Sequence, residues 1–280
     1  MSERILIAGC GDLGERAAHL LLKQGDEVYA VRRHPPGSDD GIRWLAADLT
    51  CPETLAALPP GITQLVYAPA PRAREPEAYR AVYVKGLHHV LEALDVASLK
   101  RVLFVSSSGV YGEHGDEWVN ELTPPAPQGF SGQVLWEAEQ WLSNQPIEAV
   151  VLRLAGLYGP GKLQLIDRLR AGQARAPREQ RHWANRMHVD DAAAAIVHLL
   201  ALRNPQQVYV GVDDTPLPLD VLYDHLAALA GAPPVIDGPA PVGIGSKRLS
   251  NARLRASGFQ LRWPDSRVGY AECLRGLSQS

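Results

Sequence analysis

The stretch Ile5-Leu-Ile-Ala-Gly-Cys-Gly-Asp-Leu-Gly14 places an apolar run directly before three closely spaced glycines. Apolar residues recur at helical spacing from residue 13 to residue 24, so the pattern predicts a buried strand, a tight turn and a helix. This order fits the GxGxxG fingerprint of dinucleotide binding. In that fingerprint Gly9 permits the tight turn, Gly11 admits the pyrophosphate, and Gly14 lets helix and strand pack closely.

The turn predicts a phosphate site at the helix N-terminus, where backbone amides and the helix dipole favour an anion. Three glycines can also simply end a strand, and only the rest of the chain decides between these interpretations. On the dinucleotide interpretation, the expected cofactor contacts in this stretch are Gly9, Cys10, Gly11, Asp12, Leu13 and Gly14.

The next predicted strand, residues 27–31, ends in Arg32-Arg33-His34. An NAD-binding unit usually carries an acidic residue at this position, where it binds the ribose 2′-hydroxyl. A guanidinium instead suits the 2′-phosphate of NADP. Arg32 and Arg33 therefore favour NADP(H) over NAD(H), the alternative being a pair of solvated surface arginines.

Further strands are predicted at residues 42–47, 63–68 and 101–105, and a long helix at residues 77–97. Asp48 and Leu49 follow the first of these strands, where Asp48 either accepts from the adenine amino group or caps a helix. Ala68, Pro69 and Ala70 form a small-residue rim suited to the nicotinamide ring. Alternating strands and helices predict an α/β fold, a Rossmann-type doubly wound parallel sheet with ligands at the carboxyl ends of the strands.

Composition excludes several classes of function. A net charge of −3 and no run of basic residues argue against a nucleic-acid partner. No apolar run is long enough to span a bilayer, and residues 1–4 lead into a strand with no signal-peptide pattern, so no membrane partner is expected. Three scattered cysteines without a CxxC pair predict neither a disulfide framework nor a metal site, and they fit a reducing cytoplasm.

Four later motifs, in order, resemble the extended short-chain dehydrogenase/reductase family, which includes NAD-dependent epimerases and dehydratases. The first is Val102-Leu-Phe-Val-Ser-Ser-Ser-Gly-Val-Tyr-Gly112, and the second is Arg153-Leu-Ala-Gly-Leu-Tyr-Gly-Pro-Gly161. His188-Val-Asp-Asp-Ala192 and the region from Lys247 to Phe259 complete the set. The chain departs from the family's usual GxxGxxG.

The resemblance implies that Ser107 hydrogen-bonds the reacting hydroxyl or carbonyl of a substrate and that Tyr111 lines the substrate pocket. A loop hydroxyl and an aromatic residue packed under the loop are the alternatives. Members of the family also carry a Tyr and, four residues later, a Lys as the acid/base pair. Those positions fall on Ser131 and Leu135, and residues 130–142 contain no Tyr, Lys or Arg. We therefore expect Ser131 to be a helix N-cap and Leu135 to belong to a buried face.

The second half of the chain is expected to supply a smaller substrate lobe, interleaved with the first. The predicted dinucleotide-binding domain comprises residues 1–160 and 186–212, and the lobe comprises residues 161–185 and 213–280. Arginines and a tryptophan between residues 175 and 186 suit an anionic or aromatic ligand, with Asn185 and Arg186 as substrate contacts, or form a solvated basic loop. Asp190 and Asp191 begin an alanine-rich helix, and at least one of them is interpreted as a capping residue.

These patterns predict an NADP-dependent oxidoreductase or epimerase/dehydratase-type enzyme that acts on a small carbonyl or hydroxyl compound or a sugar nucleotide. The alternative is a catalytically weak NADP(H)-binding redox sensor, which the missing Tyr and Lys favour. Family members form homodimers by packing long sheet helices together, so the resemblance implies a homodimer. Residues 77–97 and 131–143, however, show no apolar excess beyond core burial.

Overall fold

The computed structural model describes residues 2–37 and 39–277, so Met1 and residues 278–280 of the predicted domains lie outside the described residues. Its backbone contacts divide the chain into two compact units. Unit 1 comprises residues 1–107, 133–153 and 193–209, and unit 2 comprises residues 108–132, 154–192 and 210–280. In the described part of the chain, no helix is both long and apolar enough to cross a membrane.

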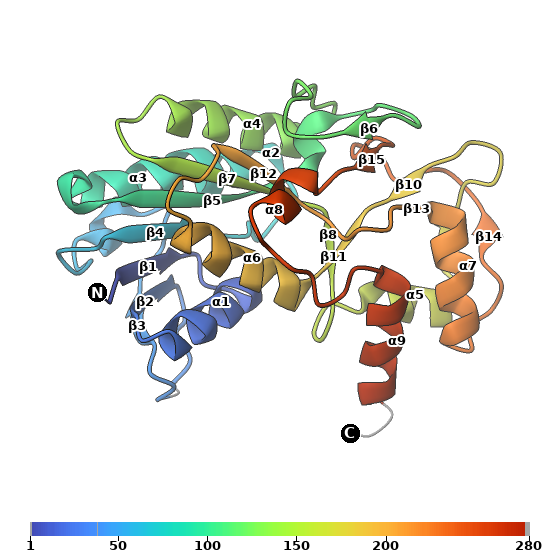
Figure 1. Ribbon diagram of the computed structural model, residues 1–280, viewed down its shortest axis with the longest axis horizontal. Coiled ribbons are helices and arrows are strands. Elements are labelled where there is room, and N and C mark those ends of the chain that lie inside the picture. Colours follow the sequence, from blue (N-terminus) through green and yellow to red (C-terminus); the bar gives the residue numbers. More distant parts are fainter. Residues whose placement is uncertain (1, 38, 278–280) are drawn as a thin grey trace. The chain divides into compact units, whose positions relative to one another are not determined.

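A seven-stranded sheet forms the centre of unit 1 (Figure 1). Its order is β3-β2-β1-β4-β5-β7-β12, and the strand pairs around β1 are parallel, with Leu6 opposite both Tyr29 and Leu65. The predicted Rossmann-type fold is confirmed. The strands are β1 (Arg4–Ala8), β2 (Glu27–Arg32), β3 (Arg43–Ala46), β4 (Gln64–Tyr67), β5 (Arg101–Ser107), β7 (Ala149–Leu154) and β12 (Val208–Gly211).

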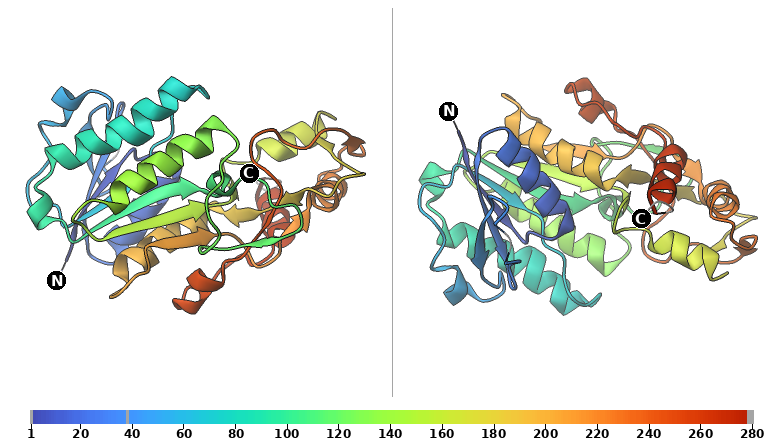
Figure 2. Two further views of the ribbon diagram at one scale, coloured as in Figure 1. Left: turned by 90° about the horizontal axis from the view of Figure 1, so that it is seen from above. Right: turned by 90° about the horizontal axis from the view of Figure 1, so that it is seen from below.

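Helices cover both faces of this sheet, with α1 and α6 on one face and α3 and α4 on the other (Figures 1 and 2). Buried small residues such as Ala17 and Ala18 let α1 lie close to the sheet. The helical segments are α1 (Asp12–Lys23), η1 (Pro52–Leu55), α2 (Pro76–Arg80), η2 (Ala81–Lys85), α3 (Gly86–Ala93), η3 (Val96–Ser98), α4 (Phe130–Ser143) and α6 (Val189–Ala201).

The long helix expected over residues 77–97 is interrupted. It consists of α2, one wide turn of π-helix at η2, and α3, which ends at Ala93. The wide turn coincides with a side-chain contact, because the Tyr67 hydroxyl donates a hydrogen bond to the Val82 carbonyl at 2.5 Å. Gly86 makes room for this hydroxyl, since a Cβ there would lie 2.7 Å from it.

Helix α4 begins two residues earlier than an N-cap at Ser131 would place it. It starts at Phe130, so Ser131 lies within the first turn, and the prediction that Ser131 is the N-cap is wrong. The first turn of α4 lies close to the backbone at Gly109. Gly132 permits this approach, because a Cβ at Gly132 would lie 2.5 Å from the Gly109 carbonyl oxygen. Backbone contact therefore sets the start of the helix.

A buried ion pair ties α4 to the sheet. The Arg153 guanidinium on β7 donates two hydrogen bonds to one oxygen of the Glu139 carboxylate, at 2.6 and 3.1 Å, and both side chains are 3% exposed. Ser106 on β5 donates a third hydrogen bond to the same carboxylate. Because a buried carboxylate is stable only when its oxygens are satisfied, this network fixes the carboxyl end of β5 against α4.

Unit 2 is built from short strand pairs and three longer helices. Strand β8 pairs with β11, β9 with β14, β10 with β13, and β6 with β15. Helices α5, α7 and α9 enclose an apolar core that includes Tyr158, Leu222 and Tyr270. The elements are η4 (Ser108–Tyr111), β6 (Trp118–Val119), β8 (Gly156–Tyr158), α5 (Gln164–Arg170), β9 (Arg175–Ala176), β10 (Trp183–Ala184), β11 (Arg186–His188), β13 (Leu217–Pro218), α7 (Leu219–Leu229), β14 (Ile236–Asp237), β15 (Arg248–Leu249), α8 (Ala252–Ala256) and α9 (Ser266–Leu277).

Two buried carboxylates hold the segment before α9. Asp191 accepts hydrogen bonds from the amides of Arg262 and Trp263, both at 2.9 Å, and Asp213 accepts one from the amide of Ser266 at 3.0 Å. The Asp191 carboxylate thus binds a segment distant in sequence, and capping of α6 by at least one of the two aspartates stays a prediction. Helix α6 begins at Val189, which places Asp190 and Asp191 in its first turn.

Replacement of Glu139 by Gln should lower the free energy of unfolding by about 3–5 kcal/mol, because it leaves the Arg153 guanidinium buried without its counter-charge. Glu137 provides a matched control on the same helix, since its ion pair with Arg80 is exposed to solvent. Glu137→Gln should cost less than about 1 kcal/mol. Urea denaturation of both variants tests this, and equal losses would contradict the role of the buried pair.

Burial, with a smaller effect from Asp265, raises the pKa of Asp213 to about 7, although hydrogen bonds from Thr215 and Ser266 oppose the shift. A carboxyl group with a raised native pKa stabilises the fold at low pH, and this contribution is lost as the pH rises from about 4 through 7. The stability advantage of the wild type over Asp213→Asn should therefore shrink between pH 5 and pH 8, by up to about 1.4 kcal/mol per pH unit. Thermal unfolding of both proteins across this range measures it, and a constant difference would refute it.

Candidate functional site

The glycine turn joins β1 to α1 in a conformation that needs glycine. Gly9 has a φ of +79°, and a Cβ there would lie 2.4 Å from the Pro69 Cα. At Gly14 a Cβ would meet the Ile7 side chain at 3.0 Å, which accounts for the close packing of helix on strand. At Gly11, in contrast, a Cβ would meet nothing within 4 Å. The chain thus leaves space beside Gly11 for a ligand.

The N-terminus of α1 faces this space without a side-chain cap, because its N-cap residue is Gly11. The first amides of a helix have no intrahelical partner and bind anions well. A pyrophosphate group therefore fits here on chemical grounds, since the donors and the open space occur together.

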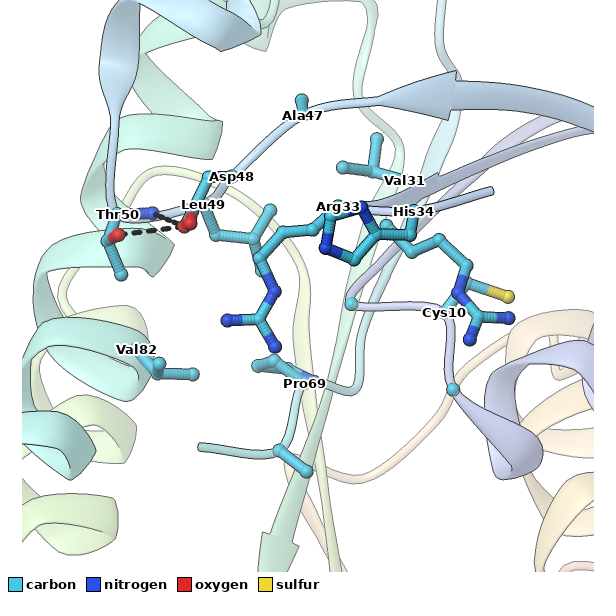
Figure 3. Close-up of a pocket in the computed structure, with 14 residues that line it drawn as sticks. Cys10, Val31, Arg33, His34, Ala47, Asp48, Leu49, Thr50, Pro69 and Val82 are labelled. Atoms are coloured by element: carbon cyan, nitrogen blue, oxygen red, sulfur yellow. Dashed lines mark hydrogen bonds between the residues drawn. The ribbon is translucent and has the colours of Figure 1, made fainter. Parts of the chain in front are cut away.

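A pocket of about 260 Å³ lies at the carboxyl ends of β1, β2, β3 and β4 (Figure 3). Its walls combine apolar residues, suited to an adenine ring, with polar residues from the strand ends. Figure 3 shows the Arg33 side chain extending across the pocket toward Pro69. The lining residues are Gly9, Cys10, Gly11, Val31, Arg32, Arg33, His34, Ala47, Asp48, Leu49, Thr50, Pro69, Ala70 and Val82.

Asp48 is held in a local turn at the edge of this pocket. Its carboxylate accepts hydrogen bonds from the Thr50 amide at 2.9 Å and the Thr50 hydroxyl at 2.7 Å. Burial acts to raise the pKa of Asp48, but these hydrogen bonds and the charges of Arg33 and Arg72 outweigh it, so the pKa is lowered. Asp48 is therefore an ionised acceptor that Thr50 orients.

The two arginines at the end of β2 have different surroundings. The Arg32 guanidinium lies 3.8 Å from the Glu15 carboxylate and 5.8 Å from the centre of the Trp44 ring. These contacts hold Arg32 at the rim.

Burial raises the pKa of the neighbouring Cys10 thiol to about 12, so that thiol is inert at neutral pH.

The pocket brings together most of the residues predicted to contact a cofactor. Asp12, Leu13, Gly14 and Ala68 were also predicted and are not part of its lining. The prediction missed Val31, His34, Ala47, Thr50 and Val82. Thr50 could have been predicted, because an Asp two residues before a Thr is typical of a turn. No local pattern predicts that Val82 lines the pocket, because it comes from the wide turn of η2.

Ser107 is the last residue of β5 and is half-buried at the carboxyl end of the sheet. Its neighbour Ser106 is committed to Glu139 through its hydroxyl. The two serines therefore have different surroundings, and the Ser106 hydroxyl is used to hold the fold.

Tyr111, Asn185 and Arg186 all lie in unit 2. Tyr111 is fully buried at the end of η4, and its carbonyl oxygen lies 3.0 Å from the His114 Nε2. The Asn185 amide joins two segments, donating to the Lys247 carbonyl and accepting from the Leu249 amide, both at 2.9 Å. Arg186 is half-buried. Contact of these residues with a substrate stays a prediction.

Lys247 is a buried cation that the sequence patterns did not single out as a site residue. Its ammonium group donates to the carbonyl oxygens of Gly112, Ile244 and Gly245, at 3.0, 2.7 and 3.2 Å. Burial lowers its pKa to about 8, while Glu113 opposes the shift. Through these three hydrogen bonds, Lys247 stabilises the loop that follows Tyr111.

Known proteins share this architecture over almost its full length. A solved structure from Methylobacillus flagellatus, described as a candidate NAD-dependent epimerase/dehydratase, is 40% identical and superposes with a TM-score of 0.83, covering 99% of this chain and 100% of that one. The UDP-glucose 4-epimerase of Thermus thermophilus, solved with NAD, has a TM-score of 0.80 at 22% identity, covers 98% and 99% of the two chains, and supports the fold alone.

Two curated proteins also match. Protein YeeZ of Escherichia coli K12 is 30% identical over 280 residues, covering 95% of this chain and 98% of YeeZ. The 3-diazoavenalumate denitrifying reductase of a Streptomyces species is 28% identical over 259 residues, covering 85% and 84% of the two chains. The sequence model described as the NAD dependent epimerase/dehydratase family matches residues 5–211. The glycine turn, the doubly wound sheet and these matches agree, and the chain belongs to the NAD-dependent epimerase/dehydratase family.

Proposed function

We propose that this protein binds NADP(H) in preference to NAD(H) and is an oxidoreductase or epimerase/dehydratase-type enzyme. Its substrate would be a small carbonyl or hydroxyl compound or a sugar nucleotide. The observation that carries the cofactor preference is the basic end of β2, where Arg32, Arg33 and His34 line the pocket. An NAD-specific unit has an acidic residue at this position.

Arg33 is the better candidate for the 2′-phosphate. Its side chain extends into the pocket (Figure 3), whereas the Arg32 guanidinium already faces Glu15 and Trp44. A guanidinium forms charge-assisted hydrogen bonds to phosphate that are about twice as strong as neutral ones. Arg32 then contributes a positive field at the rim, and Asp48 accepts a hydrogen bond from the adenine amino group.

The proposed chemistry is hydride transfer at a carbinol or carbonyl carbon, which the nicotinamide supplies or accepts when the cofactor is bound. Ser107 donates a hydrogen bond to the substrate oxygen and stabilises the charge that develops on it. The place of Ser107 supports this assignment, because it is the half-buried last residue of β5 at the carboxyl end of the sheet. The substrate lobe of unit 2 would add Tyr111, Asn185 and Arg186, with Arg186 suited to an anionic group.

A second candidate function is an NADP(H)-binding redox sensor with little turnover. Helix α4 contains Ser131, which is half-buried, and Leu135, which is buried, and the resemblance implies that they occupy the positions of the family's acid/base pair. Neither side chain moves a proton at neutral pH. Since general acid/base catalysis contributes about 10²- to 10⁴-fold, standard turnover would be slow while cofactor binding is retained.

Replacement of Arg33 by Ala should weaken NADPH binding by about 10- to 100-fold and leave NADH binding within about twofold, because a charged hydrogen bond contributes about 1.5–3 kcal/mol. Isothermal titration with both dinucleotides measures this. Lys23→Ala removes one positive charge from the exposed last turn of α1 and serves as the control. The proposed preference would be contradicted if Arg33→Ala lost equal affinity for NADPH and NADH. It would also be contradicted if the wild type bound NADH as tightly as NADPH.

Replacement of Ser107 by Ala should lower kcat by about 10²- to 10³-fold without changing NADPH affinity, because one donor to the developing oxyanion is lost. Absorbance of the reduced nicotinamide follows net reduction of 9,10-phenanthrenequinone. Chromatography of the products follows conversion of UDP-glucose, because epimerisation and dehydration return the hydride and leave the cofactor unchanged. Ser106→Ala is the adjacent control and should lower stability but not kcat. Tight NADPH binding by the wild type without turnover of either probe would favour the sensor instead.

A further inference from the structure

Unit 2 contains its own pocket of about 410 Å³, separate from the cofactor residues described above. Loop residues Pro160 and Gly161, the junction of β11 with α6, the segment before α9, and α9 itself line it. The pocket walls bring His188 and Cys273 together from positions far apart in the sequence. A thiol and an imidazole in one pocket are the parts of a nucleophilic pair.

His188 is held in one orientation by stacking. Its ring lies 3.6 Å from the Trp263 ring, centre to centre, at an interplanar angle of 24°, and it meets Tyr158 edge-on at 5.1 Å. Glu272 fixes the tryptophan, accepting from the indole nitrogen at 2.8 Å. The imidazole is only 2% exposed. Such a clamped ring presents its nitrogens in fixed directions.

Backbone hydrogen bonding assigns the proton on this imidazole. The Asp190 amide donates to His188 Nδ1 at 3.2 Å, so in the neutral ring Nδ1 is the acceptor and Nε2 carries the hydrogen. Nε2 faces the Cys273 sulfur at 3.7 Å. A hydrogen bond donated to sulfur stabilises the thiolate over the thiol. The Asp190 carboxylate lies 3.7 Å from Nδ1 and would pair with the ring only if His188 were protonated.

The other two cysteines have different surroundings. Cys10 is buried beneath the glycine turn. Cys51 is exposed, and its sulfur lies 3.9 Å from the Thr50 hydroxyl. Cys273 is half-buried, lines a pocket and faces an imidazole N–H. Among the three, Cys273 therefore combines access with thiolate stabilisation, which are the two conditions for a reactive cysteine.

We propose that Cys273 is a reactive thiol that forms a mixed disulfide with a low-molecular-weight disulfide in the unit 2 pocket, with His188 as its positioning residue. The Cys273 thiol first loses its proton to solvent, and the thiolate attacks one sulfur of the disulfide. The disulfide bond breaks, a new bond joins Cys273 to that sulfur, and the other half leaves as a thiolate that takes up a proton from solvent. One disulfide and one thiol thus give one mixed disulfide and one free thiol.

The test is to incubate the reduced full-length protein with oxidised glutathione and to follow each cysteine by peptide mass spectrometry. Cys273 should form the mixed disulfide at least about tenfold faster than Cys51, although Cys51 is more exposed. Replacement of His188 by Phe keeps an aromatic ring between Trp263 and Tyr158 but removes the N–H donor. It should slow the reaction of Cys273 about tenfold and leave that of Cys51 unchanged.

A second variant keeps the proposal falsifiable if His188→Phe fails to fold. Gly276 lines the pocket on α9, and a Cβ there meets nothing within 4 Å, so Gly276→Phe reduces access to the pocket and leaves His188 intact. It should slow modification of Cys273 and not of Cys51. Faster modification of Cys51 than of Cys273 in the wild type would overturn the proposal. An unchanged rate at Cys273 in folded His188→Phe or in Gly276→Phe would overturn it too.

Discussion

The carboxyl ends of β1 and β4 approach each other so closely that no side chain fits between them. A Cβ at Gly9 would lie 2.4 Å from the Pro69 Cα, and the positive φ of Gly9 turns the chain away from the strand at the same point. This approach lies at the switch point of the doubly wound sheet, between strands whose connections run in opposite directions. The uncapped start of α1 and the pocket lined by the strand ends both follow from it.

A second constraint operates at the end of β5. The carboxylate of Glu139 receives hydrogen bonds from Arg153 and Ser106, which joins α4, β7 and β5 through charged and polar groups in a buried setting. Such a network is costly unless every member is satisfied, so its geometry is narrowly defined. It places Ser107 at the end of a strand that cannot shift without breaking the hydrogen bond from Ser106 to Glu139. Ser106 and Ser107 are therefore adjacent in sequence but have different roles: Ser106 stabilises the fold, and Ser107 is the proposed hydrogen-bond donor to the substrate.

Unit 2 uses carboxylates in a comparable way. Asp191 binds backbone amides of the segment before α9, so polar groups of a stretch without regular structure are satisfied, and Asp213 binds the amide of Ser266 at the start of α9. This anchoring also brings Trp263 over His188, and α9 then supplies Cys273 to the same pocket. These hydrogen bonds thus help to bring a thiol and an imidazole into one pocket of unit 2.

Local sequence patterns predicted the first five strands of the sheet, its parallel arrangement and many of the residues that line the pocket at its carboxyl edge. They could do so because hydrophobic periodicity and the glycine spacing are short-range properties that fix φ, ψ and burial within a few residues. The same reasoning failed where a distant group decides the local structure. The Tyr67 hydroxyl contacts the carbonyl of Val82 at the wide turn in the helix expected over residues 77–97, and the carboxylate of Asp191 binds an amide 71 residues away. The sequence by itself therefore determined that a dinucleotide-type turn begins the chain and that β2 ends in arginines. Only the tertiary structure decided that the Ser106 hydroxyl binds Glu139 and that Cys273 faces His188. It also decided that Val82 of η2 and Thr50 complete the lining of the pocket. Each of these outcomes depends on contacts between residues remote in sequence.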